Sequence, residues 1–180
     1  MKFFFLALSG FAILHAQSSV TVLKRPAPDK ALVFQVDVPA PRAAVWEAFS
    51  TSRGLITWLA PDALVDLRKG GEWTARFPNG STGGGTILRF EPGKQLVLAA
   101  LAPDRFPVVR AERTNATFEF ETVGAGTRVQ LTQTGWKQGE EWDRAYDYLA
   151  SGNAQLLEAL RQRFITGPID WANVLTGSKH

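Results

Sequence analysis

The segment from Trp142 to Phe164 constrains the fold more than any other part of this 180-residue chain. Most of its large apolar side chains recur at steps of three, four or seven residues, which places them on one face of an α-helix of about six turns. These side chains are Trp142, Tyr146, Leu149, Leu156, Leu157, Leu160 and Phe164. Gly167-Pro168 is predicted to end the helix. Because an isolated helix with such a face is marginal in water, we expect a second layer of structure to cover it.

Strand-like segments that can form this layer fill most of the preceding sequence. Apolar residues alternate in segment 32–38 and predict a half-buried strand, and segment 20–23 predicts a short edge strand. After a break at prolines, segments 42–50 and 55–59 predict two short helices. From there on the apolar period is two, and short turns rich in glycine and proline predict an antiparallel meander. Its expected strands are 63–67, 72–77, 86–91, 95–101, 114–121 and 127–133.

This order of elements predicts an α+β fold. A curved antiparallel β-sheet wrapped around the long C-terminal α-helix, with two short helices after the first strand, buries all the apolar faces. Segment 102–113 contains two prolines and is predicted to be a long loop. Gly83-Gly84-Gly85 lacks the lysine of a phosphate-binding loop and is interpreted as a bulge or a flexible turn.

The first 16 residues are typical of a secretory signal. Lys2 supplies a positive start, residues 3–14 are mostly apolar, and Ala16 is a suitable cleavage position. The apolar run is shorter than the about 20 residues that a membrane span needs, so we expect export to the periplasm or the cell exterior without a stable membrane anchor. The predicted organisation is a signal peptide 1–16, a lead-in 17–30, a folded domain 31–165 and a C-terminal tail 166–180.

The composition excludes several kinds of chemistry. The chain has no cysteine and two histidines, of which His15 lies in the signal segment and His180 is the last residue. A thiol nucleophile, a Ser-His-Asp triad and a zinc site built on cysteine or histidine are therefore not expected, and we predict neither a metal nor a cofactor. The net charge is only +3 and the basic residues are scattered, so nucleic acid is not an expected partner.

Several short motifs occur in an order and spacing that are typical of one family. They are Ala40-Pro41, Val45-Trp46-Glu47-Ala48-Phe49, Gly70-Gly71-Glu72-Trp73, Gly85-Thr86-Ile87, Phe90-Glu91-Pro92-Gly93, Gln95-Leu96-Val97-Leu98 and a segment from Gly126 to Trp136. Together they resemble the AHSA-type branch of the START-like (SRPBCC) superfamily over residues 31–165, a branch named after an activator of a heat-shock-protein ATPase. The resemblance implies the helix-grip fold, with a cavity between sheet and helix that holds lipids, hormones or polyketides across the superfamily. Some members of the superfamily are enzymes.

One departure from this family concerns the long helix. The branch often carries Gly-Trp where this chain has Gly152-Asn153, so a large aromatic group is replaced by a small polar one. We expect a cavity of about 300 Å³ or more beside Asn153, with its amide bonded to Gln133, to a tyrosine, to water or to a ligand. The predicted lining is Trp58, Trp73, Phe77, Phe118, Phe120, Gln133, Tyr146, Leu149 and Asn153.

Three functions stay open at this point, and no catalytic residue is assigned. The favoured one is an exported protein, monomeric or homodimeric, that binds a small apolar or amphipathic molecule in the cavity. A metal-free enzyme of the cyclase or hydrolase type, using carboxylates, a tyrosine or an arginine in the same cavity, is the second. The candidate carboxylates Asp62, Asp66, Glu72 and Glu91 are not on predicted inward faces. The third is a protein-interaction module that resembles the chaperone ATPase activator.

The signal segment generates the first testable prediction. Cleavage after Ala16 should leave Gln17 as the first residue of the mature protein. The intact mass of the protein recovered from outside the cytoplasm measures this directly. A membrane-associated species that keeps residues 1–16 would contradict it.

Overall fold

The computed structural model describes residues 19–177, so the predicted signal sequence lies outside the described residues. The sheet is antiparallel and has the strand order β1-β2-β8-β7-β6-β5-β4-β3. Its strands are β1 (Thr21–Arg25), β2 (Ala31–Val38), β3 (Asp62–Val65), β4 (Glu72–Arg76), β5 (Thr82–Glu91), β6 (Gln95–Leu101), β7 (Thr114–Val123) and β8 (Gly126–Thr134). The helices are α1 (Arg42–Ser50), α2 (Ser52–Ile56), α3 (Pro107–Glu112), α4 (Glu140–Thr166) and α5 (Trp171–Gly177).

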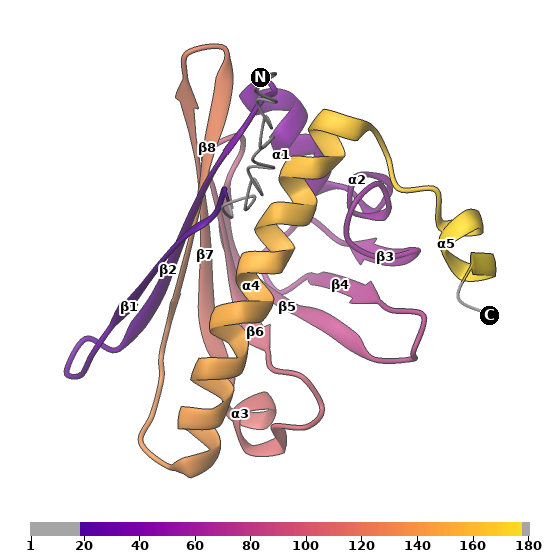
Figure 1. Cartoon of the computed structure of the whole chain (residues 1–180). Coiled ribbons are helices and arrows are strands. Elements are labelled where there is room, and N and C mark those ends of the chain that lie inside the picture. The colour runs from indigo at the N-terminus through magenta and orange to yellow at the C-terminus, as the bar shows by residue number, and fades with distance from the viewer. Residues whose placement is uncertain (1–18, 178–180) are drawn as a thin grey trace, which may run out of the picture.

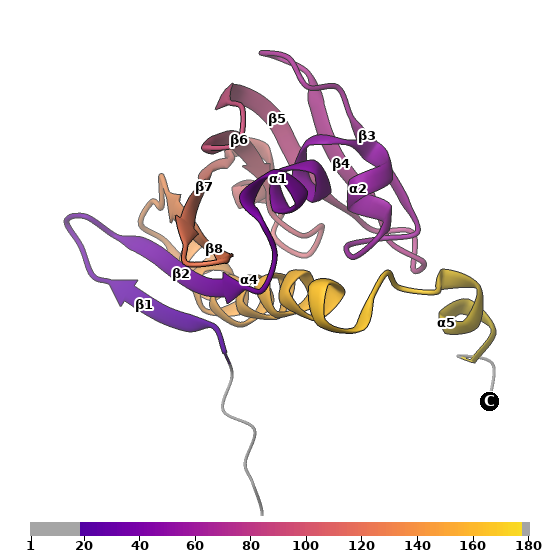
Figure 2. The ribbon, with the colours of Figure 1, turned by 90° about the horizontal axis from the view of Figure 1, so that it is seen from above.

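The sheet curves around α4, as predicted for this α+β fold (Figures 1 and 2). Strands β3 to β8 follow one another as a meander, and β2 pairs with β8 so that the β1–β2 hairpin extends the sheet at one edge (Figure 1). Helices α1 and α2 cover the inner side of the sheet beyond the C-terminal half of α4 (Figure 2). The concave face therefore holds both α4 and the α1–α2 pair.

Helix α4 presents the predicted apolar face to the sheet. Trp142, Tyr146, Leu157 and Leu160 are buried, whereas Leu149 and Leu156 lie half-buried at one side of the stripe. The inner sheet residues that meet this region alternate along their strands, as in Phe118 and Phe120 or Val129 and Leu131. The register deduced from the sequence is confirmed. Within residues 19–177, the structure has no helix that is both long and apolar enough to span a membrane.

The prediction of a long loop over residues 102–113 is wrong in part, because this segment contains α3. The two backbone N–H groups of Val108 and Val109 donate to Glu141 Oε1 of α4 at 2.8 and 3.1 Å, so a carboxylate from another helix satisfies the start of α3. Phe106 and Val109 are buried against Trp142 in a small core of their own. A helix of one to two turns that depends on a distant carboxylate has too short a pattern to be recognised from the sequence.

Two other expectations need correction. Gly83-Gly84-Gly85 is not a turn but part of β5, because a Cβ at Gly84 would lie 2.0 Å from the carbonyl oxygen of Trp73 and only glycine permits this approach. The second short helix spans Ser52–Ile56 rather than 55–59, since the Thr51 side chain caps it by accepting from Gly54 N at 2.8 Å. The C-terminal tail contains α5, which the Trp171 indole anchors by donating to Ile56 O.

The stability of the fold should depend on the buried face of α4. Leu160 is fully buried, so Leu160→Ala should lower the free energy of unfolding by about 2–5 kcal/mol in denaturant titrations. Gln155→Ala, at an exposed position of the same helix, should change it by less than about 0.5 kcal/mol. Equal losses in the two variants would mean that the helix face is assigned wrongly.

Candidate functional site

A small cavity lies between α4 and the inner face of the sheet. Its volume is about 80 Å³. The residues around it are Trp73, Gly84, Leu98, Ala100, Leu101, Ala116, Phe118, Leu131, Gln133, Leu149, Asn153 and Leu156. The sheet residues at its floor, such as Trp73, Phe118 and Gln133, are buried, whereas Leu149, Asn153 and Leu156 on the helix are half-buried. This gradient places the mouth of the cavity along α4.

A row of three bonded polar side chains begins in the otherwise apolar wall, where Asn153 and Gln133 line the cavity, and ends at Thr114 outside the lining. Asn153 Nδ2 donates to Gln133 Oε1 at 2.8 Å, and Gln133 Nε2 donates in turn to Thr114 Oγ1 at 2.8 Å. Gln133 and Thr114 are both buried. The expected bond between Asn153 and Gln133 is confirmed. Because a buried amide is costly without partners, this row explains how the apolar interface tolerates Asn153.

The structure brings together five of the nine residues predicted to line the cavity. These five are Trp73, Phe118, Gln133, Leu149 and Asn153. Trp58 and Phe120 instead pack around Phe49 of α1, with ring centroids 5.1 and 5.0 Å from the Phe49 ring. The indole of Trp58 is also held by donation to Ala48 O at 3.0 Å. These two aromatic residues are part of the core under α1.

The other two predicted residues lie at the ends of the fold. Phe77 is half-buried beside the β4–β5 turn, where its ring would be 3.2 Å from a Cβ at Gly83. Tyr146 is buried, and its hydroxyl oxygen lies 2.9 Å from Ala31 O and 3.1 Å from Arg25 O of the β1–β2 hairpin. Neither residue lines the cavity around Asn153. Both side chains are on the predicted inward side, but they lie too far along the chain from Asn153 to reach the cavity.

The predicted volume of about 300 Å³ or more is wrong, because the cavity measures about 80 Å³. Large aromatic side chains at the floor limit the volume. The Trp73 and Phe118 rings lie 6.2 Å apart at its floor, and the Trp73 indole is fixed by donation to Phe49 O at 2.7 Å. As it stands, this volume accommodates a few water molecules or a very small apolar group.

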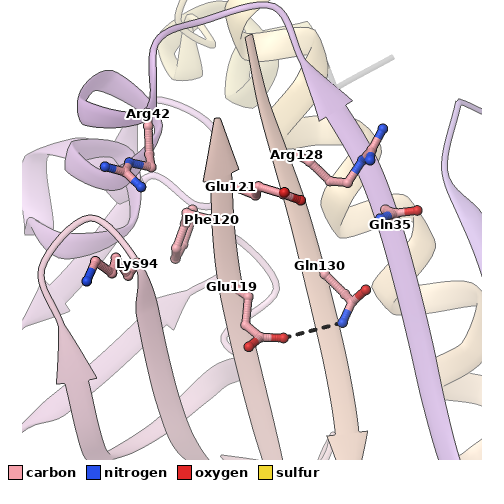
Figure 3. A pocket seen from close by; sticks show the side chains of 8 residues that line it. All are labelled: Gln35, Arg42, Lys94, Glu119, Phe120, Glu121, Arg128 and Gln130. Carbon is pink, nitrogen blue, oxygen red and sulfur yellow. Dashed lines mark hydrogen bonds between the residues drawn. The ribbon is translucent and has the colours of Figure 1, made fainter. Parts of the chain in front are cut away.

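The outer face of the sheet carries a shallow hollow of about 370 Å³ at the ends of β7, β8 and β2 (Figure 3). Its polar side chains pair across the strands: Gln130 Nε2 donates to Glu119 Oε2 at 3.3 Å, as Figure 3 shows. Arg128 binds Asp37 through two bonds of 2.8 and 3.1 Å. These are the cross-strand pairs expected of a solvated sheet face, so the hollow is not a good candidate site.

A larger groove, of about 880 Å³, lies between the β1–β2 hairpin and the start of α4. The aromatic residues in its lining are Trp136 and Tyr146, and four basic side chains surround them. Sequence reasoning missed this groove because its two sides are more than a hundred residues apart and neither carries a periodic pattern. Within the described residues, no group of three His, Cys, Asp or Glu side chains is placed to hold a metal ion.

A curved antiparallel sheet that grips a long C-terminal helix, with a cavity between them, defines the helix-grip class of proteins. The chain belongs to the family of Activator of Hsp90 ATPase homolog 1-like proteins, whose model matches residues 39–164. The resemblance inferred from the short motifs is thereby confirmed. A comparison with curated proteins gave no match.

Solved structures of low sequence identity share this fold. The protein MLL2253 from Mesorhizobium loti is 22% identical, with a TM-score of 0.63 over 74% of this chain and 95% of its own. The Aha1 dimer from Colwellia psychrerythraea is 20% identical, with a TM-score of 0.62 over 76% of this chain and 97% of its own. CalU16 from Micromonospora echinospora is 19% identical, with a TM-score of 0.59 over 91% of each chain.

The polar row generates a prediction about stability. Gln133→Leu removes the acceptor of Asn153 and the donor to Thr114, so the free energy of unfolding should fall by about 1–3 kcal/mol. Adding Asn153→Leu should recover part of this loss, because no unpaired amide is then left at the cavity.

Denaturant titrations of the single and double variants measure this coupling. Gln130→Leu, on the outer face of the same strand, is the matched control and should cost less than about 0.5 kcal/mol. A loss at Gln130 as large as that at Gln133 would contradict the assigned role of the row.

Proposed function

We propose that the protein is an exported binding protein for a small apolar or amphipathic molecule, held between the sheet and α4. The observation that carries this proposal is the bonded pair of Asn153 and Gln133 in the wall of an apolar cavity, with Gln133 held in turn by Thr114. Ligand sites of this kind combine a largely apolar lining with a few placed polar groups. An amphipathic molecule would direct its polar end to the row and its apolar body to Trp73 and Phe118.

The size of the cavity determines how such a ligand enters. A molecule of more than a few heavy atoms needs more room than about 80 Å³, so side chains at the mouth must move. Leu149 and Leu156 are half-buried and flank Asn153 on the helix, and Gly84 on the opposite strand has no side chain. Rotation of the two leucines toward solvent widens the cavity without displacing the buried floor.

The lining also distinguishes binding from acid–base catalysis. None of the residues around the cavity has a side chain that titrates. General acid–base catalysis needs such a group within hydrogen-bond reach of the substrate, so an enzyme of the cyclase or hydrolase type is the weaker candidate. Interaction with a chaperone ATPase, which the family description suggests, fits poorly with export, because that ATP-driven partner acts in the cytoplasm. Export itself rests on the sequence of residues 1–16.

A substitution at Asn153 tests the site. Asn153→Trp places the residue common in the family at the mouth and should fill the cavity. Binding of the neutral fluorescent probe N-phenyl-1-naphthylamine should then weaken by about tenfold or more, since the lost apolar contacts correspond to at least one large side chain.

The matched control is Gln155→Trp, which adds the same indole at an exposed position of α4 and should bind the probe like the parent. Circular dichroism and denaturant titration verify that both variants keep the fold. Unchanged affinity of the folded Asn153→Trp variant would place the ligand elsewhere and remove the basis of the proposal.

A further inference from the structure

We propose that the chain has a second ligand site, for a small organic anion with an aromatic body, in the groove at the start of α4. Three segments form this groove: the connection of the β1–β2 hairpin, the connection from β8 to α4, and the first two turns of α4 (Figure 1). Its lining residues are Lys24, Arg25, Pro26, Ala27, Pro28, Lys30, Trp136, Lys137, Gln138, Gly139, Asp143 and Tyr146. None of them lines the inner cavity, so this site is independent of the proposed function.

The volume and the aromatic wall of the groove suit a flat apolar body. About 880 Å³ lies within the usual range for small-molecule sites, in contrast to the inner cavity. Trp136 and Tyr146 meet edge to face, with ring centroids 5.0 Å apart and planes at 85°. Pro26 and Pro28 of the hairpin connection also line the groove. Such rigid apolar surfaces bind an aromatic ring at a small cost in conformational entropy.

Hydrogen bonds hold this wall in place. The Tyr146 hydroxyl lies within hydrogen-bond distance of the hairpin carbonyls of Arg25 and Ala31, and the Trp136 indole donates to Gln133 O at 3.0 Å. Burial raises the pKa of the Tyr146 phenol, and the positive charges of Lys24 and Lys30 only partly offset this effect. The phenol therefore keeps its proton at neutral pH and continues to donate. The groove is preorganised rather than formed by loose loops.

The charge around the wall is positive. Lys24, Arg25, Lys30 and Lys137 line the groove, whereas Asp143 is the one acidic residue among the described lining. Two lysine ammonium groups stand near the Tyr146 ring, with Lys30 Nζ 4.8 Å and Lys24 Nζ 5.7 Å from its centroid. An acidic group bound beside the ring would thus lie next to Lys24 of β1 and Lys30 of the hairpin connection.

The cations are available to a ligand to different degrees. Lys24 pairs with Asp147 at 2.7 Å and Lys30 with Asp143 at 2.6 Å, but both carboxylates are largely exposed, and such pairs contribute little. Lys137 pairs with Glu112 at the surface. Within residues 19–177, Arg25 has no ion-pair partner, so its guanidinium is the best placed to bind a carboxylate or sulfonate through two bonds.

The start of α4 offers uncapped backbone N–H groups beside the groove. Gln138 and Gly139 of the lining lead into the first turn, and no side chain caps its backbone N–H groups. The three acidic residues of this turn do not fill that role: Glu140 pairs with Arg144, Glu141 accepts from α3, and Asp143 binds Lys30. A ligand acid group at the lip of the groove can take the place of the missing cap.

A pair of probes that differ only by a charge tests the site. 8-Anilino-1-naphthalenesulfonate is N-phenyl-1-naphthylamine with a sulfonate added, so the two share their aromatic body. The anionic probe should bind the parent protein in the groove, and increasing sodium chloride should weaken its binding because the charges are exposed to solvent. Failure of the parent to bind the anionic probe, or binding insensitive to salt, would overturn the proposal.

Charge reversal locates the anionic probe. The double variant Arg25→Glu/Lys137→Glu should bind it about tenfold more weakly or worse, and should bind the neutral probe like the parent. Lys69→Glu/Arg89→Glu changes the net charge equally at exposed positions outside the groove and should leave both affinities unchanged. If this control pair weakens the anionic probe as much, the effect comes from net charge and the groove is not the site.

Two further variants separate this site from the inner cavity. Asn153→Trp should leave the affinity for the anionic probe intact, and its loss there would mean that this probe occupies the inner cavity instead. Trp136→Leu should weaken the anionic probe by removing half of the aromatic wall. Because Trp136 also packs against the core, its binding result counts only if denaturant titration shows that the variant is folded. The charge-reversal variants locate the anionic probe whether or not Trp136→Leu folds.

Discussion

Burial of the apolar face of α4 is the interaction on which the rest of the structure depends. Without this helix, inner residues of β2, β7 and β8 such as Phe34, Phe118 and Leu131 would lose much of the cover that keeps them from water. Each large side chain buried in this way contributes about 1.5–3 kcal/mol, so the helix and the sheet are stable only together. The same contact sets the location of both candidate sites, because α4 supplies one wall of each.

Asn153 interrupts this apolar contact, and a hydrogen bond to Gln133 offsets the free-energy cost of burying its amide. Its amide bonds to Gln133, and Gln133 bonds to Thr114, so the polar groups form a chain between helix and sheet. A satisfied polar row in an apolar wall gives orientation to a bound molecule and supplies no titrating group. This combination of side chains is the basis of the ligand-binding role that we propose for the inner cavity.

Features that depend on the periodicity of apolar residues could be predicted from the sequence. Features that depend on three-dimensional packing could not. The α4 stripe and the strand alternation were correct, and the Asn153–Gln133 contact followed because both residues lie on inward faces. Helix α3 depends on a carboxylate of Glu141, and Gly84 lies in a strand because the Trp73 backbone approaches it closely. The cavity volume depends on how aromatic rings pack, to within fractions of an ångström. None of these leaves a regular trace in the sequence.

The two candidate sites lie on one stripe of the helix rather than on opposite faces. Tyr146 and Asn153 are seven residues apart, which is nearly two full turns and about 10 Å along the axis. The stripe meets the β1–β2 hairpin at Tyr146 and the inner cavity at Asn153, so position along the helix decides which site a residue serves. Gln133 is bonded toward both: its carbonyl accepts from Trp136 of the groove, and its side chain accepts from Asn153. The two sites thus come closest at this residue of β8, although no residue that lines one of them also lines the other.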